Sequence, residues 1–163
     1  MKVLEGKIAQ QEDQSRRNNL IFYGIPEGAT DNWQKAEADV RVFLKDKMQI
    51  VDADDPDKLV IERAHRLGGK KPGHTRPVIT RFLNWKQKSE VFVKARDLPR
   101  DSTIRIGEDF SKRVRDDRQR LYPKLREAKQ PGKRASLRFD KLFVDNIVYI
   151  VNDQNEIVVN VAR

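Results

Sequence analysis

Two hydrophobic periodicities alternate along residues 18–109, and their order limits the folds that this chain can adopt. Apolar residues at every second position predict strands over residues 19–25, 58–67, 76–84 and 102–109. Helical spacing predicts one helix after the first strand and another after the third. The order β-α-β-β-α-β predicts a ferredoxin-like α+β domain, with one four-stranded sheet and both helices on one face. The third strand should then be central, and the second face of the sheet should be open.

Both predicted helices begin with a capping signal. Asp31 followed by Gln34 is a candidate capping box for the first helix, and Asn84 is a candidate N-cap for the second, which stops before Pro99. Their apolar stripes are expected to face the core. These stripes are Trp33, Ala36, Val40, Phe43, Leu44 and Met48 in the first helix, and Trp85, Val91, Phe92 and Ala95 in the second.

A different pattern begins after Asp109 and predicts a small second domain over residues 110–163. An amphipathic basic helix comes first, and Pro123 within it predicts a kink or a break near Tyr122. Its apolar face comprises Phe110, Val114, Leu121, Leu125 and Ala128. Short strands follow over residues 135–139, 141–145, 147–151 and 156–161, with a tight turn at Asp145-Asn146. The order predicts a helix-plus-β-meander domain.

The segment before the first strand, residues 1–17, is polar and helix-prone. Leu4 and Ile8 lie at helical spacing, and Gln11 and Ser15 extend the seam weakly. Two interpretations stay open, the end of a coiled-coil helix and a frayed terminus. The predicted organisation is therefore residues 1–17, a domain over 18–109 and a domain over 110–163.

The charge of the chain is basic and unevenly spread. The net charge is +9 and the isoelectric point is near 9.8. Residues 61–84 hold six basic side chains and one acidic side chain. Residues 85–134 hold sixteen basic and eight acidic side chains. Such clustering favours an anionic partner, nucleic acid first and a membrane surface second. No apolar stretch is long enough to span a membrane or to act as a signal peptide, so we expect no membrane partner and an intracellular location.

Strand alternation predicts which side chains reach the open face of the sheet. In the third strand Thr80 and Phe82 should point inward, and Ile79 and Arg81 outward. The first strand has two possible registers. We favour the one with Leu20 and Phe22 inward and Asn19, Ile21 and Tyr23 outward over the one that exposes Phe22. The second strand should divide into Val60, Glu62, Ala64 and Arg66 on one face and Ile61, Arg63 and His65 on the other.

This face is a poor platform for base stacking. Pro77 and Ile79 stand where RNA-recognition motifs place their stacking aromatic residues, so Tyr23 is the best candidate. Basic residues surround it, namely Arg63 or Arg66, Arg81, Lys70 and Lys71. Each of these basic residues, taken alone, is most simply a solvated surface charge. Because they are predicted to lie together on one face, they indicate phosphate-dominated binding with weak sequence selectivity.

Catalytic and metal-binding patterns are weak. The absence of cysteine excludes disulfides and cysteine-ligated zinc. His65 and Glu62 would lie on opposite faces of a strand, and residues 68–73 lack the strand-to-helix context of a phosphate-binding loop. We therefore expect no enzyme, no metal site and no cofactor. The alternative function is a protein-interaction module that uses the open sheet face without nucleic acid.

Six segments in fixed order resemble the RNA-binding first-open-reading-frame protein of LINE-type retrotransposons. They are RRNNLIFYGIPE, ERAHRLG, RPVITRF, VKARD, EDFS and ASLRFDKLFVD, within residues 16–150. The resemblance implies a trimeric coiled coil, an atypical RNA-recognition motif and a C-terminal domain. It also implies a nucleic-acid chaperone that coats single-stranded RNA, with single-stranded DNA as a second ligand, in cytoplasmic ribonucleoprotein particles and also in the nucleus.

By matched position, the RNA-contacting residues of that family fall on Arg17, Asn19, Arg81, Arg96 and Arg118. The chain departs from the family pattern at Gln119 and Ile21, where arginines are common. Residue chemistry and resemblance together give one candidate set of nucleic-acid-binding residues. The set is Arg16, Arg17, Asn19, Tyr23, Arg63, Arg66, Lys70, Lys71, Arg81, Arg96, Arg113, Arg115 and Arg118.

Overall fold

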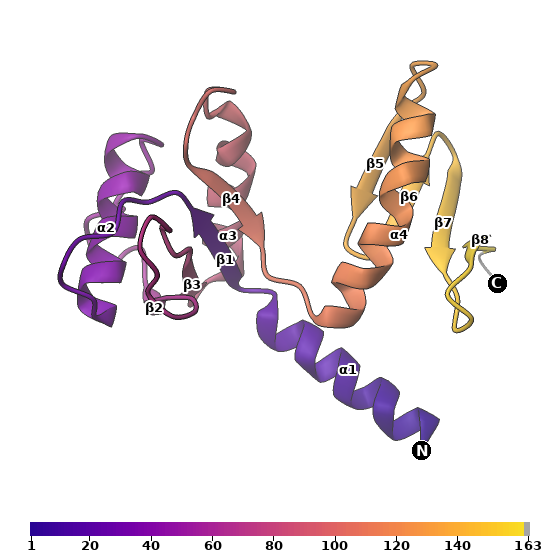
Figure 1. Ribbon diagram of the computed structural model, residues 1–163, viewed down its shortest axis with the longest axis horizontal. Helices are drawn as coiled ribbons and strands as arrows, with labels where there is room; N and C mark the ends of the chain where they lie inside the picture. The colour runs from indigo at the N-terminus through magenta and orange to yellow at the C-terminus, as the bar shows by residue number, and fades with distance from the viewer. Residues whose placement is uncertain (162–163) are drawn as a thin grey trace. The chain divides into compact units, whose positions relative to one another are not determined.

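The computed structural model describes residues 1–161 and shows a mixed α+β chain with two antiparallel four-stranded sheets (Figure 1). Contacts between residues divide the chain into two compact units, Met1–Asp109 and Phe110–Arg163. Each unit has its own hydrophobic core, so each is described by itself. The last two residues of the predicted C-terminal domain, 162–163, lie outside the described part.

The sheet of the first unit has the strand order β2-β3-β1-β4. Its strands are β1 (Asn19–Tyr23), β2 (Ile61–Arg66), β3 (Val78–Phe82) and β4 (Arg105–Glu108). All neighbouring pairs are antiparallel. The central position predicted for the strand over residues 76–84 is therefore confirmed, because β3 lies between β2 and β1.

Two helices cover one face of this sheet. They are α2 (Trp33–Asp46) and α3 (Trp85–Lys94), and a 3-10 turn, η1 (Ala95–Asp97), extends α3. Their buried residues join those of the strands in a single core cluster. Trp33 and Trp85 were predicted to face the core, but they are 58% and 51% exposed. Each stands at the first helical position, about one turn before the first buried residue of its helix.

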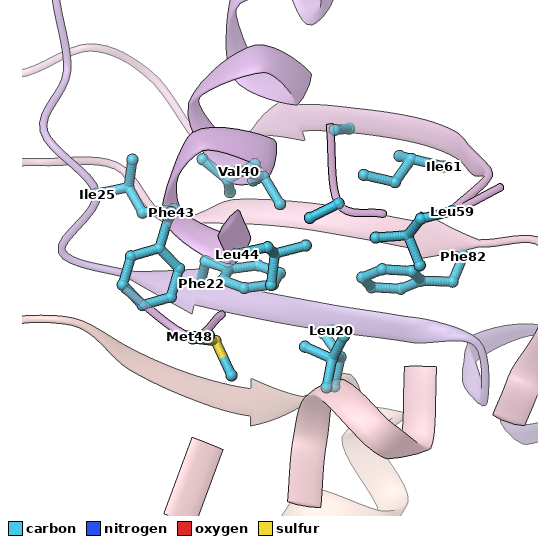
Figure 2. Close-up of a cluster of buried hydrophobic side chains, with 14 of the residues drawn as sticks. Leu20, Phe22, Ile25, Val40, Phe43, Leu44, Met48, Leu59, Ile61 and Phe82 are labelled. Atoms are coloured by element: carbon cyan, nitrogen blue, oxygen red, sulfur yellow. The ribbon is translucent and has the colours of Figure 1, made fainter. Parts of the chain in front are cut away.

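The core between sheet and helices fixes the strand registers. Leu20 and Phe22 of β1 and Phe82 of β3 are fully buried (Figure 2). The Phe22 ring meets the Phe43 ring of α2 edge to face, with centroids 6.2 Å apart. The favoured register of β1 is confirmed, and so is the inward direction of Thr80 and Phe82.

The predicted N-cap of α3 is confirmed, whereas that of α2 is wrong. Asn84 caps α3, and its side chain accepts hydrogen bonds from the amides of Lys86 and Gln87. At α2 the cap is Asn32, which accepts from the amide of Lys35. The predicted capping box at Asp31 is therefore wrong, since the Asp31 carboxylate is bound to a distant arginine described below.

Strand β2 does not alternate as predicted. A β-bulge between Ile61 and Arg63 inserts one extra residue into the ladder with β3. As a result Ile61 and Ala64 are both buried, while Glu62 and Arg63 are both exposed. The predicted division is therefore wrong for Ile61 and Glu62. It is confirmed after the bulge, where Arg63 and His65 are exposed and the side chains of Ala64 and Arg66 are buried.

The second unit packs one long helix against its own sheet. The helix α4 (Lys112–Lys129) contacts three strands of the sheet, which has the order β5-β6-β7-β8 (Figure 1). The strands are β5 (Ala135–Arg138), β6 (Lys141–Val144), β7 (Ile147–Val151) and β8 (Ile157–Val159). Asp145-Asn146 joins β6 to β7, with Asp145 at a φ of 52°, as the turn prediction requires.

Pro123 lies within α4 without breaking it, so of the predicted kink or break near Tyr122 the break does not occur, and the kink stays a prediction. Leu121 is fully buried, and Leu125 and Ala128 pack against the same core. Apolar contacts on both sides of the proline thus hold the helix together, although Pro123 removes one backbone hydrogen bond.

The N-terminal helix α1 (Lys2–Arg16) has no buried residue. Leu4 and Ile8, the predicted seam, are 66% and 59% exposed. The exposure of Leu4 and Ile8 does not decide between the end of a coiled-coil helix and a frayed terminus. The coiled coil therefore stays a prediction. Among the described helices, none is both long and apolar enough to cross a membrane.

Candidate nucleic-acid interface

The open face of the first sheet is organised in cross-strand rows. One row joins Arg63, Arg81 and Asn19, which are direct Cα partners across β2, β3 and β1. The adjacent row has Ile79 opposite Ile21 at its centre, with the exposed His65 beside Ile79 on β2. Because strand residues alternate with period two, all these side chains lie on the face away from the helices, where Asn19 is buried. A row with two arginines, the basic row, therefore runs beside a row with an apolar centre.

The basic row carries more positive than negative charge. The Nε atom of Arg81 lies 2.9 Å from Oε2 of Glu62, without the direction of a hydrogen bond. Both side chains are about two-fifths exposed, so this pair is weak. Arg63 is exposed and has no ion pair within residues 1–161. One carboxylate thus faces two guanidinium groups, and an added anion would be favoured here.

A hollow of about 390 Å³ adjoins Arg81 at the junction of α1 and β1. Its lining residues are Gln11, Gln14, Ser15, Arg17, Asn18 and Arg81. Arg17 is exposed and has no side-chain partner in the described structure. The side-chain carbonyl oxygens of Asn18 and Asn19 are buried and accept no hydrogen bond. Two cations and two vacant acceptors therefore lie close together.

Asp109 holds Arg16 and Asn19 in place at the same end of the sheet. Its carboxylate accepts from the Arg16 guanidinium and from the Asn19 amide, each at 2.9 Å. The Asp109 side chain is 8% exposed, and Asn19 is buried. Arg16 also pairs with Glu12 one turn earlier. Arg16 and Asn19 thus have firm partners within the unit, in contrast to Arg17.

Tyr23 marks the other end of β1. Its ring is 39% exposed, and the guanidinium carbon of Arg105 lies 5.6 Å from the ring centroid. The two residues are Cα partners across β1 and β4. Arg105 was missing from the candidate set. Period-two alternation along residues 102–109, which buries Ile104 and Ile106 against the core, could have placed it outward.

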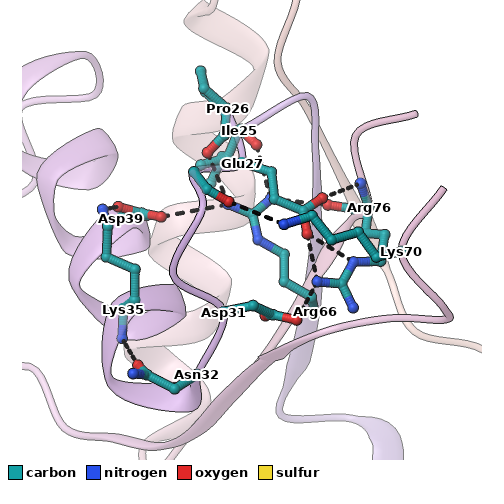
Figure 3. A network of polar contacts seen from close by, with 11 residues as sticks. Ile25, Pro26, Glu27, Asp31, Asn32, Lys35, Asp39, Arg66, Lys70 and Arg76 are labelled. Atoms are coloured by element: carbon teal, nitrogen blue, oxygen red, sulfur yellow. Dashed lines mark hydrogen bonds and ion pairs between the residues drawn. The ribbon is translucent and has the colours of Figure 1, made fainter. Parts of the chain in front are cut away.

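Arg66 has a structural position, which removes it from the exposed candidates. Its side chain is 4% exposed. It donates to the carbonyls of Ile25, Pro26 and Arg76 at 2.8–2.9 Å, and it pairs with Asp39 at 3.4 Å (Figure 3). A buried guanidinium with these oxygens around it is satisfied without a phosphate.

Lys70 and Lys71 lie in the loop between β2 and β3 and are exposed. Lys70 reaches the carbonyl of Gly28 at 3.4 Å, and the backbone of Lys71 accepts from the amide of His74. Arg96, in η1, is also exposed, but its neighbours Ala95 and Leu98 pack against the helix-covered core. Arg96 therefore lies outside the rows of the open face.

The arginines of α4 differ from one another in their surroundings. Arg113 pairs with Asp117 at 2.9 Å and with Asp140 at 3.2 Å. Arg115 is exposed, and in the described part of the chain its side chain makes no hydrogen bond or ion pair. Lys112 pairs with Asp116 one turn on, so part of the helix charge is neutralised internally.

Arg118 sits in an aromatic setting within the second unit. Its guanidinium lies 4.4 Å from the ring centroid of Phe110 and 6.0 Å from that of Tyr122. It also donates to the carbonyl of Phe139 at 2.7 Å. Tyr122 and Phe139 are 42% and 43% exposed. These exposed rings beside a cation offer stacking surfaces in addition to Tyr23 of the first sheet. The candidate set included Arg118 but missed the rings around it.

No group of three or more potential metal ligands occurs among residues 1–161. No protein-family model matches the chain, and no curated protein matches it significantly. The argument for a function therefore depends on the fold, the rows of the open face and the distribution of charge.

Proposed function

We propose that the chain is a single-stranded nucleic-acid-binding protein with weak sequence selectivity, and that RNA is its main ligand. The first unit would be an atypical RNA-recognition motif of the ferredoxin-like type. The strand order β2-β3-β1-β4, with α2 and α3 on one face, supports that assignment. The two accessible arginines of the row on the open face, Arg63 and Arg81, carry the proposal.

The chemistry of that face favours backbone recognition over base recognition. Arg63, Arg81 and Arg17 supply forked donors that suit phosphate oxygens. Tyr23, beneath Arg105, offers one stacking surface, and Ile21 and Ile79 offer only apolar contact. Phosphate contacts set affinity and carry no direct sequence information, so selectivity should be weak.

The second unit would add contacts of a different kind. Arg115 offers a free cation, and Tyr122 and Phe139 offer exposed rings near Arg118. Aromatic faces accept any base, which again fits binding without sequence preference. The basic excess over residues 85–134 would then be part of the same function.

The resemblance to the LINE-type first-open-reading-frame protein extends this proposal to a biological role. The chain would form ribonucleoprotein particles and act as a nucleic-acid chaperone in retrotransposition, mainly in the cytoplasm. It would assemble as a trimer through a coiled coil that continues upstream of α1. The exposed Leu4 and Ile8 support such pairing. We propose no catalytic activity.

A binding experiment with one variant and one control tests the function. We expect tight binding to single-stranded RNA, weaker binding to duplex of equal length, and a steep loss with salt. Arg81→Ala should weaken binding about tenfold, since a hydrogen bond to a charged group is worth about 1.5 kcal/mol or more. Lys47→Ala, which removes an exposed cation at the end of α2, should change it little.

Two results would contradict the proposal. Equal losses in Arg81→Ala and Lys47→Ala would mean that the open face has no special role. Salt-independent binding of another protein, with no affinity for nucleic acid, would favour the interaction-module alternative.

A further inference from the structure

The loop between β2 and β3 is held in one shape at its base and at its tip. We call residues 67–75 the basic arm, because Lys70 and Lys71 are exposed on it. At the tip, Pro72 and Gly73 occupy the centre of a tight turn closed by the His74 amide and the Lys71 carbonyl. Gly73 has a φ of 72°, as the third residue of a type II turn requires.

Two buried arginines flank the arm and fix its base. Arg76 donates through Nε to Oε1 of Glu27 at 2.8 Å, and its backbone amide donates to Oε2 of the same carboxylate at 3.2 Å. Its other nitrogens bind Asp31 and the Gly68 carbonyl, the latter at 3.0 Å. Arg66, on the opposite side of the arm, binds the carbonyls of Ile25 and Pro26 (Figure 3).

These contacts form what we call the clamp, which comprises Glu27, Asp31, Asp39, Arg66 and Arg76. The side chains of Glu27 and Arg76 are each 8% exposed. Within the clamp three carboxylates face two arginines, and Lys35, which pairs with Asp39, supplies the third positive charge. The clamp and Lys35 together thus have balanced charges. The charges of Lys70 and Lys71 are left for another partner.

We propose that Glu27, Arg66 and Arg76 are positioning residues of the nucleic-acid site, which hold the basic arm in its binding shape before nucleic acid arrives. This role rests on the function proposed above. A glycine-rich loop without such ties would have to be ordered on binding, and each immobilised long side chain would reduce affinity. The clamp removes that cost in advance.

Because Glu27 is negatively charged, its substitution tests the proposal by whether RNA affinity rises or falls. Glu27→Gln removes a negative charge beside the basic arm, which by electrostatics alone should strengthen RNA binding. If the clamp positions the arm, the same change should weaken binding by about fivefold or more. Glu90→Gln is the matched control, because Glu90 is exposed on α3 and has no partner in the described residues. It should leave affinity unchanged or slightly raised.

A second readout needs no nucleic acid. Trypsin should cut after Lys70 faster in Glu27→Gln than in the wild type or in Glu90→Gln, because the arm is freed. Should Glu27→Gln fail to fold, Asp31→Asn takes its place, since the Asp31 carboxylate is 37% exposed and the change is milder. It should alter cleavage and binding in the same directions.

The outcomes separate this inference from the proposed function. If the wild type binds RNA and Glu27→Gln binds as well or better, the positioning role is wrong while the function stands. Unchanged tryptic cleavage would also overturn the positioning role. If the wild type binds no single-stranded nucleic acid, the proposed function itself is wrong, and the positioning role is wrong with it.

Discussion

At the scale of single residues, neighbours on one strand have opposite roles. Phe82 is fully buried in the first core, whereas Arg81 emerges on the open face. Phe82→Ala should lower the free energy of unfolding by about 3–5 kcal/mol, and Arg81→Ala should change it little. Chemical denaturation of both variants, followed by RNA titration of the folded one, checks this. Loss of stability in Arg81→Ala with none in Phe82→Ala would contradict the register.

Glu27 should make the first unit sensitive to acid. The hydrogen bond from Arg76 lowers the pKa of Glu27 from 4.5 to about 2. A depressed carboxylate pKa means that the clamp contributes fully above pH 4.5 and loses its contribution as the pH falls toward 2. The midpoint of thermal unfolding should therefore fall over this range, and it should fall less in Glu27→Gln. An identical pH profile in the variant would contradict the linkage.

At the scale of elements, α4 contains an exposed proline that its packing tolerates. Pro123 lacks the amide that would donate within the helix, and its ring crowds the preceding turn. Pro123→Ala should therefore stabilise the second unit, by about 1–3 kcal/mol. Thermal unfolding of the full chain measures it. A neutral or destabilising effect would mean that the helix follows a bend that the proline favours.

Two arginines of α4 should respond differently to substitution. Arg115→Ala should leave the unfolding midpoint unchanged and lower the salt slope of RNA binding by about 0.7, the value for one phosphate contact on a single strand. Arg118→Ala should lower the midpoint, because Arg118 binds the Phe139 carbonyl and stacks on Phe110. An unchanged slope in Arg115→Ala would exclude phosphate contact by that residue.

The elements themselves were largely predictable, because each depends on local patterns. Period-two alternation predicted which side chains of β1 and β3 face the core, and Asn84 predicted the start of α3. The bulge in β2 was not predictable, since it depends on how two strands pair and one strand carries no signal for it. The prediction of a kink or a break at Pro123 could not say which would occur, and the helix stays continuous because tertiary packing outweighs the local preference.

At the scale of the whole molecule, charge alone did not show which basic residues are available. Arg66 and Arg76 look like the other arginines in sequence, yet both are buried by contacts to residues some 40 or more positions away. Arg17, Arg63 and Arg115 are exposed, and their side chains make no hydrogen bond or ion pair in the described residues. Only the folded chain separates structural arginines from those that an RNA could use.

The central claim is that single-stranded RNA lies on the open face of the first sheet. NMR titration of the isotopically labelled full chain with a short single-stranded RNA tests it most directly. We expect the largest amide and side-chain shifts at Arg63, Ile79 and Arg81, with little change at Val42 and Val93, which are exposed on α2 and α3. Shifts confined to α2 and α3, with none in the open-face rows, would contradict the account.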